Sequence, residues 1–349
     1  MKHSFLSLRA LGRAVCTVAL TAVWCVHAAP AKRVAGSGLT GNSPYATDAY
    51  PGFDGLDALP APEKKETSWF LGVSRDTPAE QLAWAREMEA QGSKWRARRG
   101  YDALVREWPT SPEAPVAQAA LAKIWAVQYK DYEEAVEALF YLLDFYPRAC
   151  SYLEQVEYAY QLVNLMLKER RSFLGFSLVS TRLCRQYYES IVRRAPGLSY
   201  VPEAMLKIAA LREEDQQYEE AVKVYGALAA RYPLTPEAMV AVYREAKARM
   251  WICRRLAYNI PRCRDTERFL ASAVARYPAL PEIEELKTWL GELKAYLAED
   301  AYRQAKFYDS RQRTRHAART AWERYLQEYP DSPYADGVRA RILELSGAK

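Results

Sequence analysis

The chain has 349 residues, a formal net charge of +6 and three histidines. Its length allows either one elongated repeat domain or two globular domains. The small net charge makes nucleic-acid binding a poor expectation, and the shortage of histidine leaves little material for acid–base chemistry.

Residues 1–28 have the order of a secretory signal peptide. The basic start MKHSFLSLRALGR precedes the apolar run AVCTVALTAVWCV and the small residues of VHAAP. Val26 and Ala28 fit the small-x-small rule, so cleavage is expected after Ala28. The apolar run is shorter than the ~20 residues that span a bilayer, and a retained N-terminal anchor is the alternative. Export would lower the net charge to +3, because Lys2, Arg9 and Arg13 leave with the signal.

Cys25 raises the separate possibility of a lipid anchor. Bacterial lipoproteins are acylated on a cysteine at the end of the signal, which normally follows Gly, Ala or Ser. Here it follows Trp24. We therefore interpret Cys25 as an ordinary residue of the apolar run and keep its lipidation as the alternative.

Residues 29–67 are rich in Gly, Pro, Ala, Ser and Asp and show no periodicity. Such a segment cannot bury enough apolar surface to offset the entropy of ordering it. The sequence therefore predicts a flexible linker before a folded region at 68–349.

From about residue 78 onward, apolar residues recur at the spacing of amphipathic helices. Six prolines punctuate this region, and the residue before each is aromatic except at Ala195. A small residue stands twelve positions before each proline and a bulky one eight before it, so both share a helical face. The prolines are Pro109, Pro147, Pro196, Pro233, Pro278 and Pro330. The small residues are Ala97, Ala135, Cys184, Ala221, Thr266 and Ala318. The bulky residues are Tyr101, Leu139, Tyr188, Tyr225, Leu270 and Trp322.

Each punctuating proline is expected to stop one helix. A second proline, in SPEA, TPEA, LPEI and SPYA, is expected at the first position of the next helix, after a capping Ser or Thr where one is present. The spacing predicts six antiparallel helical hairpins and a capping helix. Their ranges are 78–91 with 93–108, 112–129 with 131–146, 150–170 with 177–195, 202–215 with 217–232, 236–257 with 263–277, 281–308 with 312–329, and 333–346.

The small, bulky and proline positions resemble the second helix of a tetratricopeptide repeat, whose basic unit has 34 residues. The expected fold is therefore an all-α, right-handed superhelix of about six hairpins. A more specific resemblance is to the outer-membrane assembly lipoprotein BamD and its relatives. It is strongest over 293–342, with the pattern Leu-Ala-x-x-x-x-x-x-Ala-x-Phe-Tyr and the closing YPDSPYA, and weaker over 112–195.

The resemblance implies a periplasmic scaffold at the inner face of the outer membrane. N-terminal repeats would bind unfolded outer-membrane proteins, and C-terminal repeats would bind a BamA-type outer-membrane insertase. Six hairpins instead of the family's usual five, and DSRQRTR at 309–315 in place of its Arg-Gly turn, keep an alternative open. That alternative is another exported tetratricopeptide adaptor for cell-envelope or division machinery.

Two sets of residues are candidates for binding partners. Aromatic or sulfur side chains on first helices are expected to line a peptide groove: Trp84, Met88, Trp125, Tyr129 and Tyr158. The basic helix near the C-terminus is expected to be a solvated face, or alternatively to dock on an acidic partner or on anionic lipid. Its arginines are Arg311, Arg313, Arg315 and Arg319.

Catalysis and cofactors are not expected. His316 is the only histidine after export, and no phosphate loop, nucleophilic triad or closely spaced metal-ligand set is present. Cys184 occupies a small core position. Cys253 and Cys263 flank a helical turn, where a disulfide is plausible in an oxidising compartment. A bond between Cys150 and Cys184 would contradict the predicted pairing of helices.

Overall fold

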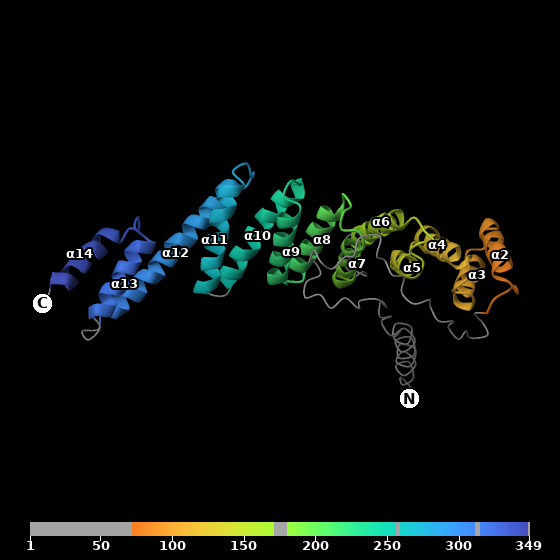
Figure 1. Cartoon of the computed structure of the whole chain (residues 1–349), viewed down its shortest axis with the longest axis horizontal. Helices are drawn as coiled ribbons and strands as arrows, with labels where there is room; N and C mark the ends of the chain where they lie inside the picture. The colour runs from red at the N-terminus through yellow and green to blue at the C-terminus, as the bar shows by residue number, and fades with distance from the viewer. Residues whose placement is uncertain (1–71, 171–179, 256–258, 311–314, 348–349) are drawn as a thin grey trace, which may run out of the picture. The chain divides into compact units, whose positions relative to one another are not determined.

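The computed structural model describes residues 72–170, 180–255, 259–310 and 315–347. Within these ranges the chain forms thirteen α-helices and one π-helix, and no strand (Figure 1). The elements are α2 (Pro78–Ala90), α3 (Lys94–Glu107), α4 (Ala114–Lys123), η4 (Ile124–Tyr129), α5 (Tyr132–Phe145), α6 (Tyr152–Arg170), α7 (Thr181–Arg194), α8 (Val201–Glu214), α9 (Tyr218–Arg231), α10 (Pro236–Arg255), α11 (Ile260–Arg276), α12 (Ile283–Asp309), α13 (Arg315–Glu328) and α14 (Ala335–Gly347). The predicted signal peptide and linker lie outside the described residues.

Each helix packs on the helix before it and the helix after it, as Figure 1 shows. The pairs α2–α3, α4/η4–α5, α6–α7, α8–α9, α10–α11 and α12–α13 are the six predicted hairpins, and α14 is the predicted capping helix. Helix ends differ from the predicted ones by about four residues at most. The all-α repeat fold is confirmed.

The small and bulky positions identified in the sequence form the hairpin core. All six small residues are at most 4% exposed, and all six bulky ones at most 3%. A small side chain lets the second helix approach its neighbours, and the bulky side chain one turn later fills the space beside it. Cys184, at one of the small positions, is fully buried.

Two buried amides join the helices of the first two hairpins. Gln81 on α2 donates from Nε2 to the carbonyl of Gly100 on α3 at 3.0 Å. Gln118 on α4 donates to the carbonyl of Ala138 on α5 at 2.9 Å. Each amide satisfies polar groups that would be costly to bury unpaired.

The prediction that the second proline begins each helix is correct at Pro236 but wrong at three other positions. Pro112, Pro281 and Pro333 each stand two residues before their helix. A four-residue turn precedes each of these helices, closed for example by the bond from Ala335 N to Ser332 O at 3.0 Å. Thr235, one of the expected capping residues, also bonds elsewhere, since its hydroxyl donates to the carbonyl of Tyr232 at 2.9 Å. The prolines therefore shape the turn between hairpins.

Candidate functional site

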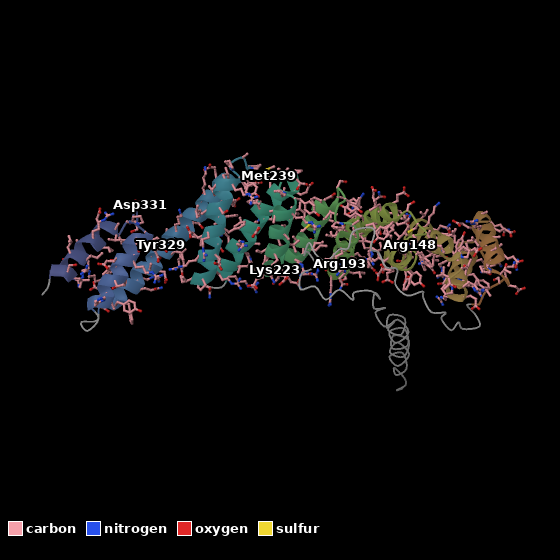
Figure 2. All side chains as sticks on the ribbon, viewed as in Figure 1. Arg148, Arg193, Lys223, Met239, Tyr329 and Asp331 are labelled. Atoms are coloured by element: carbon pink, nitrogen blue, oxygen red, sulfur yellow. A yellow bond between two sulfur atoms is a disulfide. The ribbon has the colours of Figure 1, made fainter. Side chains whose placement is uncertain are left out.

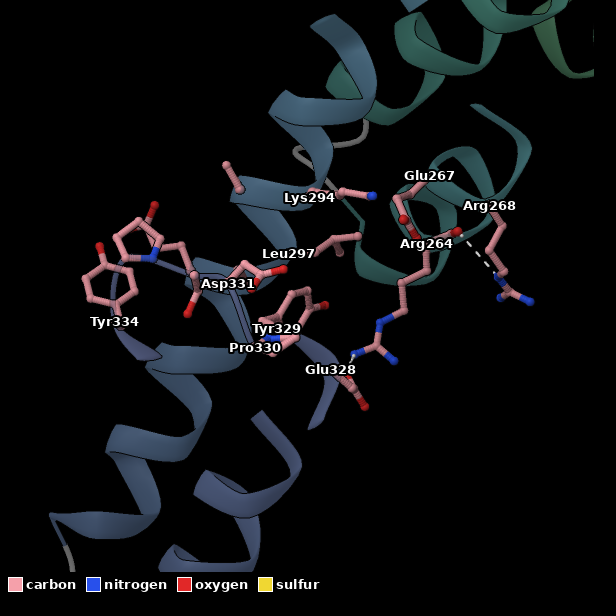
Figure 3. Close-up of a pocket in the computed structure, with 15 residues that line it drawn as sticks. Arg264, Glu267, Arg268, Lys294, Leu297, Glu328, Tyr329, Pro330, Asp331 and Tyr334 are labelled. Carbon is pink, nitrogen blue, oxygen red and sulfur yellow. Dashed lines mark hydrogen bonds and ion pairs between the residues drawn. The ribbon is translucent and has the colours of Figure 1, made fainter. Parts of the chain in front are cut away.

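A cleft of about 720 Å³ lies where the fifth hairpin meets the sixth (Figure 3). Residues of α11 and α12 form two of its walls, and the end of α13 with the following loop forms a third. Figure 2 labels Tyr329 and Asp331 of the third wall. The lining residues are Arg264, Glu267, Arg268, Lys294, Ala295, Leu297, Ala298, Glu299 and Glu328 to Tyr334.

The cleft lies beside α12 where this helix passes from one hydrophobic cluster to another. At 27 residues, α12 is the longest helix described. Its first part, from Leu286 to Leu297, packs with α10 and α11. Its later residue Ala305 belongs to a separate cluster with Trp322 and Val338. Tyr329 packs against both clusters, at the junction where the cleft lies.

The cleft has an apolar floor and charged walls. Leu297 and Ala298 are only 4% and 7% exposed, so they lie at its base. Arg264 of α11 and Glu328 of α13 face each other across 3.7 Å. Lys294, Glu267 and Asp331 have no ion pair among the residues that the structure describes. Such a surface can accept an extended polypeptide through apolar contacts below and charged contacts along both sides.

Tyr329 forms part of the third wall and is half-buried. Burial, with a smaller contribution from the carboxylate of Glu328, raises the pKa of its phenol above the ordinary value. A tyrosine phenol is already protonated at neutral pH, and the raised pKa keeps this one able to donate a hydrogen bond into more alkaline solution.

The five predicted groove residues lie on the first helices of the first three hairpins. Trp84, Trp125 and Tyr158 are half-buried, and Tyr129 is 39% exposed. Met88 is only 8% exposed and packs in the first core cluster, which leaves little of it for a ligand. Trp125 and Tyr129 contact each other, with ring centroids 5.1 Å apart.

Aromatic contacts between successive first helices were not anticipated from the sequence. Tyr160 of α6 stacks on Tyr200, which precedes α8, with ring centroids 4.4 Å apart. Tyr302 of α12 stacks in the same way on Tyr334, which precedes α14, also at 4.4 Å. The signal that could have found both is a tyrosine immediately before a first helix, in LSY and SPY.

A second, smaller pocket of about 320 Å³ involves α10 and its neighbours. Trp251 stacks on Tyr218 with ring centroids 3.7 Å apart, and Arg255 lies over the Trp251 ring. Arg244 and Lys247 bring positive charge to the pocket, and Arg244 pairs with Glu213 at 3.6 Å.

Of the four arginines predicted to dock on a partner, the structure describes the side chain of Arg319. Arg311, Arg313 and the side chain of Arg315 lie outside the described residues. Arg319 is exposed and pairs with Glu323 at 2.7 Å. The cations that line the C-terminal cleft come instead from α11 and α12, which sequence reasoning did not single out.

The structure joins Cys253 to Cys263 in a disulfide, with Cα atoms 5.6 Å apart. The bond ties the end of α10 to the start of α11. Cys150 is half-buried and is not disulfide-bonded. Cys25 lies outside the described residues.

Possible metal ligands do not cluster in the described parts of the chain. These parts contain no group of three His, Cys, Asp or Glu side chains that could hold a metal ion. His316 is exposed and lies within 3.4 Å of the hydroxyl of Thr320 on its own helix. None of the described helices is long and apolar enough to cross a bilayer.

Comparison with known proteins agrees with the helical hairpins. A family model described as "Tetratricopeptide repeat" matches residues 203–235 and 301–332. The chain contains tetratricopeptide repeats. Residues 203–235 run from α8 through α9, and residues 301–332 run from the end of α12 through α13. Repeats of this kind mediate protein–protein interactions, so the chain is suited to act as an interaction scaffold.

Among solved structures, a tetratricopeptide repeat protein from Parabacteroides merdae is similar at 15% identity and a TM-score of 0.29. The match covers 77% of this chain and 98% of that one. No curated protein matches the chain.

Proposed function

We propose that the chain is a non-catalytic periplasmic scaffold of the machinery that assembles outer-membrane β-barrels. Its C-terminal hairpins would bind a BamA-type insertase, and its N-terminal hairpins would bind unfolded barrel precursors. One observation carries this proposal: the C-terminal cleft is lined largely by residues of the 293–342 stretch that resembles BamD.

The disulfide between Cys253 and Cys263 supports the proposed compartment. Structural disulfides persist in oxidising compartments such as the bacterial periplasm and are rare in the cytosol. Export through a cleaved signal peptide would place the chain there.

Site-specific crosslinking tests the partner. A photoreactive amino acid replaces Asp331, at the cleft, or Lys223, a matched exposed position on α9. The expected result is a covalent adduct with a BamA-type protein from Asp331 and none from Lys223. If neither position, nor the intact chain on co-purification, captures such a protein, the assembly role is wrong. A division or cell-envelope protein captured at Asp331 would support the alternative adaptor role.

Fractionation tests the proposed location at the inner face of the outer membrane. The chain is expected with the outer membrane and in a protease-protected periplasmic orientation. A Cys25→Ser variant that still fractionates with the membrane would show that lipidation of Cys25 does not hold the protein there.

A further inference from the structure

Four cations stand close together at the start of α3 without a carboxylate partner. Lys94, Arg96, Arg98 and Arg99 flank Trp95 in the sequence, and none of the four forms an ion pair within the described chain. Further along the same helix, Arg106 does pair with Asp102 at 2.7 Å. The start of α3 therefore carries net positive charge that the fold itself does not neutralise.

Two of these four cations, Arg98 and Arg99, lie against aromatic rings. The guanidinium of Arg98 lies 4.8 Å from the ring centroid of Trp125 and 5.9 Å from that of Tyr129. Arg99 lies 5.4 Å from the ring of Trp95. The ammonium of Lys94 reaches the carbonyl of Gln128 at 3.5 Å. We call the residues Lys94, Trp95, Arg96, Arg98, Arg99, Trp125 and Tyr129 the α3–η4 patch.

The π-helix η4 helps to form this patch. Its wider turn ends at Lys130, whose φ of 54° is left-handed, and the carbonyl of Trp125 accepts from the backbone N–H of Asp131 at 3.0 Å. A π-turn inside a helix is uncommon and often marks a functional site. Here it belongs to the segment that holds the rings of Trp125 and Tyr129 together under Arg98.

We propose that the α3–η4 patch binds the surface of an anionic phospholipid bilayer. Trp95 is 55% exposed and Tyr129 is 39% exposed, so both rings are accessible to a partner. Tryptophan and tyrosine favour the headgroup level of a membrane. Lysine and arginine beside them are attracted to anionic headgroups. The patch combines both requirements on adjoining elements.

An acidic protein is the other partner that unpaired cations could bind. The exposure of the patch favours the bilayer, because Lys94, Trp95 and Arg96 all stand out into solvent rather than line the cleft or the smaller pocket described above. A flat lipid surface can reach such side chains together, and arginine can donate two hydrogen bonds to a lipid phosphate.

Vesicle binding by the full chain tests the proposal. The probes are vesicles of phosphatidylcholine alone and vesicles that also contain phosphatidylglycerol. Binding is expected only with phosphatidylglycerol and is expected to weaken as salt is added. Lys94→Gln with Arg96→Gln should lower the partition constant by about tenfold or more, since each charge near an anionic surface contributes about fivefold. The N-terminal region is the same in all variants, so any contribution it makes to vesicle binding is equal among them.

Lys223→Gln with Lys287→Gln is the matched control. It removes the same charge from two exposed lysines that already pair with glutamates, Glu220 and Glu284. It should leave the partition constant within about twofold. Quenching of tryptophan fluorescence by brominated lipid should fall in Trp95→Phe, whose fold is checked by circular dichroism.

Three outcomes would overturn the proposal. The first is equal partitioning of the two double variants, and the second is equal binding to both kinds of vesicle. The third is a Lys94→Gln, Arg96→Gln variant that keeps vesicle binding but loses binding to polyglutamate, which would assign the patch to an acidic protein.

Discussion

The phenol of Tyr232 donates a hydrogen bond to the backbone carbonyl of Pro196 at 2.7 Å. Tyr232 directly follows α9, the second helix of the fourth hairpin, and Pro196 lies two residues after the end of α7, that of the third. Tyr146 makes the same bond to Pro109 at 2.6 Å, between the second hairpin and the first. In these two cases the aromatic residue that ends one hairpin donates a hydrogen bond to the proline that follows the preceding hairpin, so the bond joins successive hairpins.

The other hairpins lack this hydrogen bond between tyrosine and proline among the described contacts. Where the aromatic residue is replaced by Ala195, the neighbouring Arg194 instead binds Asp144 of the preceding hairpin through two bonds of 2.7 and 2.9 Å. Among the described contacts, neither Tyr277 nor Tyr329 has a hydroxyl bond to the preceding proline. Tyr329 instead lines the C-terminal cleft.

Tyr232→Phe should lower the free energy of unfolding by about 1 kcal/mol, because it removes one net hydrogen bond and leaves the Pro196 carbonyl unpaired. Tyr277→Phe is the matched control and should change it by less than about 0.5 kcal/mol. Urea unfolding followed by circular dichroism measures both. Equal effects of the two substitutions would contradict a role for the bond.

Gly100→Ala should destabilise the first hairpin by about 1–3 kcal/mol through overpacking. A Cβ at Gly100 would lie 2.8 Å from the ring of Trp84 and 2.9 Å from the Cβ of Ala85. Gly291 of α12 has open space at the same position, so Gly291→Ala should stabilise by about 0.5–1 kcal/mol. Thermal unfolding of the two variants measures these effects. A shift of the melting temperature in the same direction for both variants would contradict the prediction.

Reduction of the Cys253–Cys263 bond should lower the free energy of unfolding by about 2–3 kcal/mol. The bond closes a loop between cysteines ten positions apart, and its removal raises the conformational entropy of the unfolded chain. Both cysteines are fully buried, so reduction is expected to need partial opening of the α10–α11 hairpin. Urea unfolding with and without dithiothreitol measures the loss. The double variant with both cysteines changed to serine should show no response to dithiothreitol, and a persistent response would point to other cysteines.

Asp309 should contribute stability that acid removes. The carboxylate accepts from Arg341 Nε at 2.8 Å and Nη2 at 2.9 Å, and these bonds lower its pKa. The lowered pKa means that the ionised carboxylate stabilises the folded protein at pH values above the pKa of an unfolded-state aspartate, ~3.9. This stabilisation is lost as the pH falls through the lower pKa that Asp309 has in the folded state. Asp309→Asn should therefore cost about 1 kcal/mol at neutral pH and progressively less below about pH 4.

Hydrogen exchange of α14 amides and urea unfolding across this pH range measure the effect of Asp309→Asn. The exposed Asp336, paired with Arg339 three residues away, supplies the control. Asp336→Asn should change stability by less than about 0.5 kcal/mol at any of these pH values. A cost of Asp309→Asn that does not depend on pH would refute the titration argument.

Local patterns were sufficient to predict the hairpins. Proline stops, the spacing of four between small and bulky residues, and the run of apolar positions all act within about twelve residues along the chain. Ala97 and Tyr101, for example, share a face of α3 wherever α3 lies, and both are buried as predicted. The capping prolines were less well predicted because a short turn can precede a helix without changing its neighbours.

The sequence by itself therefore determined the helical class, the number of hairpins and the residues of their cores, because helix formation and amphipathic packing depend on near neighbours. Only the tertiary structure decided which hairpins hydrogen-bond through Tyr232 and Pro196, where α12 leaves a cleft, and that Arg98 meets Trp125 and Tyr129. These contacts join residues 27 to 64 positions apart, so they depend on how each hairpin is oriented against the next. That orientation follows from the packing of whole helix faces and from helix length, which no short sequence pattern specifies.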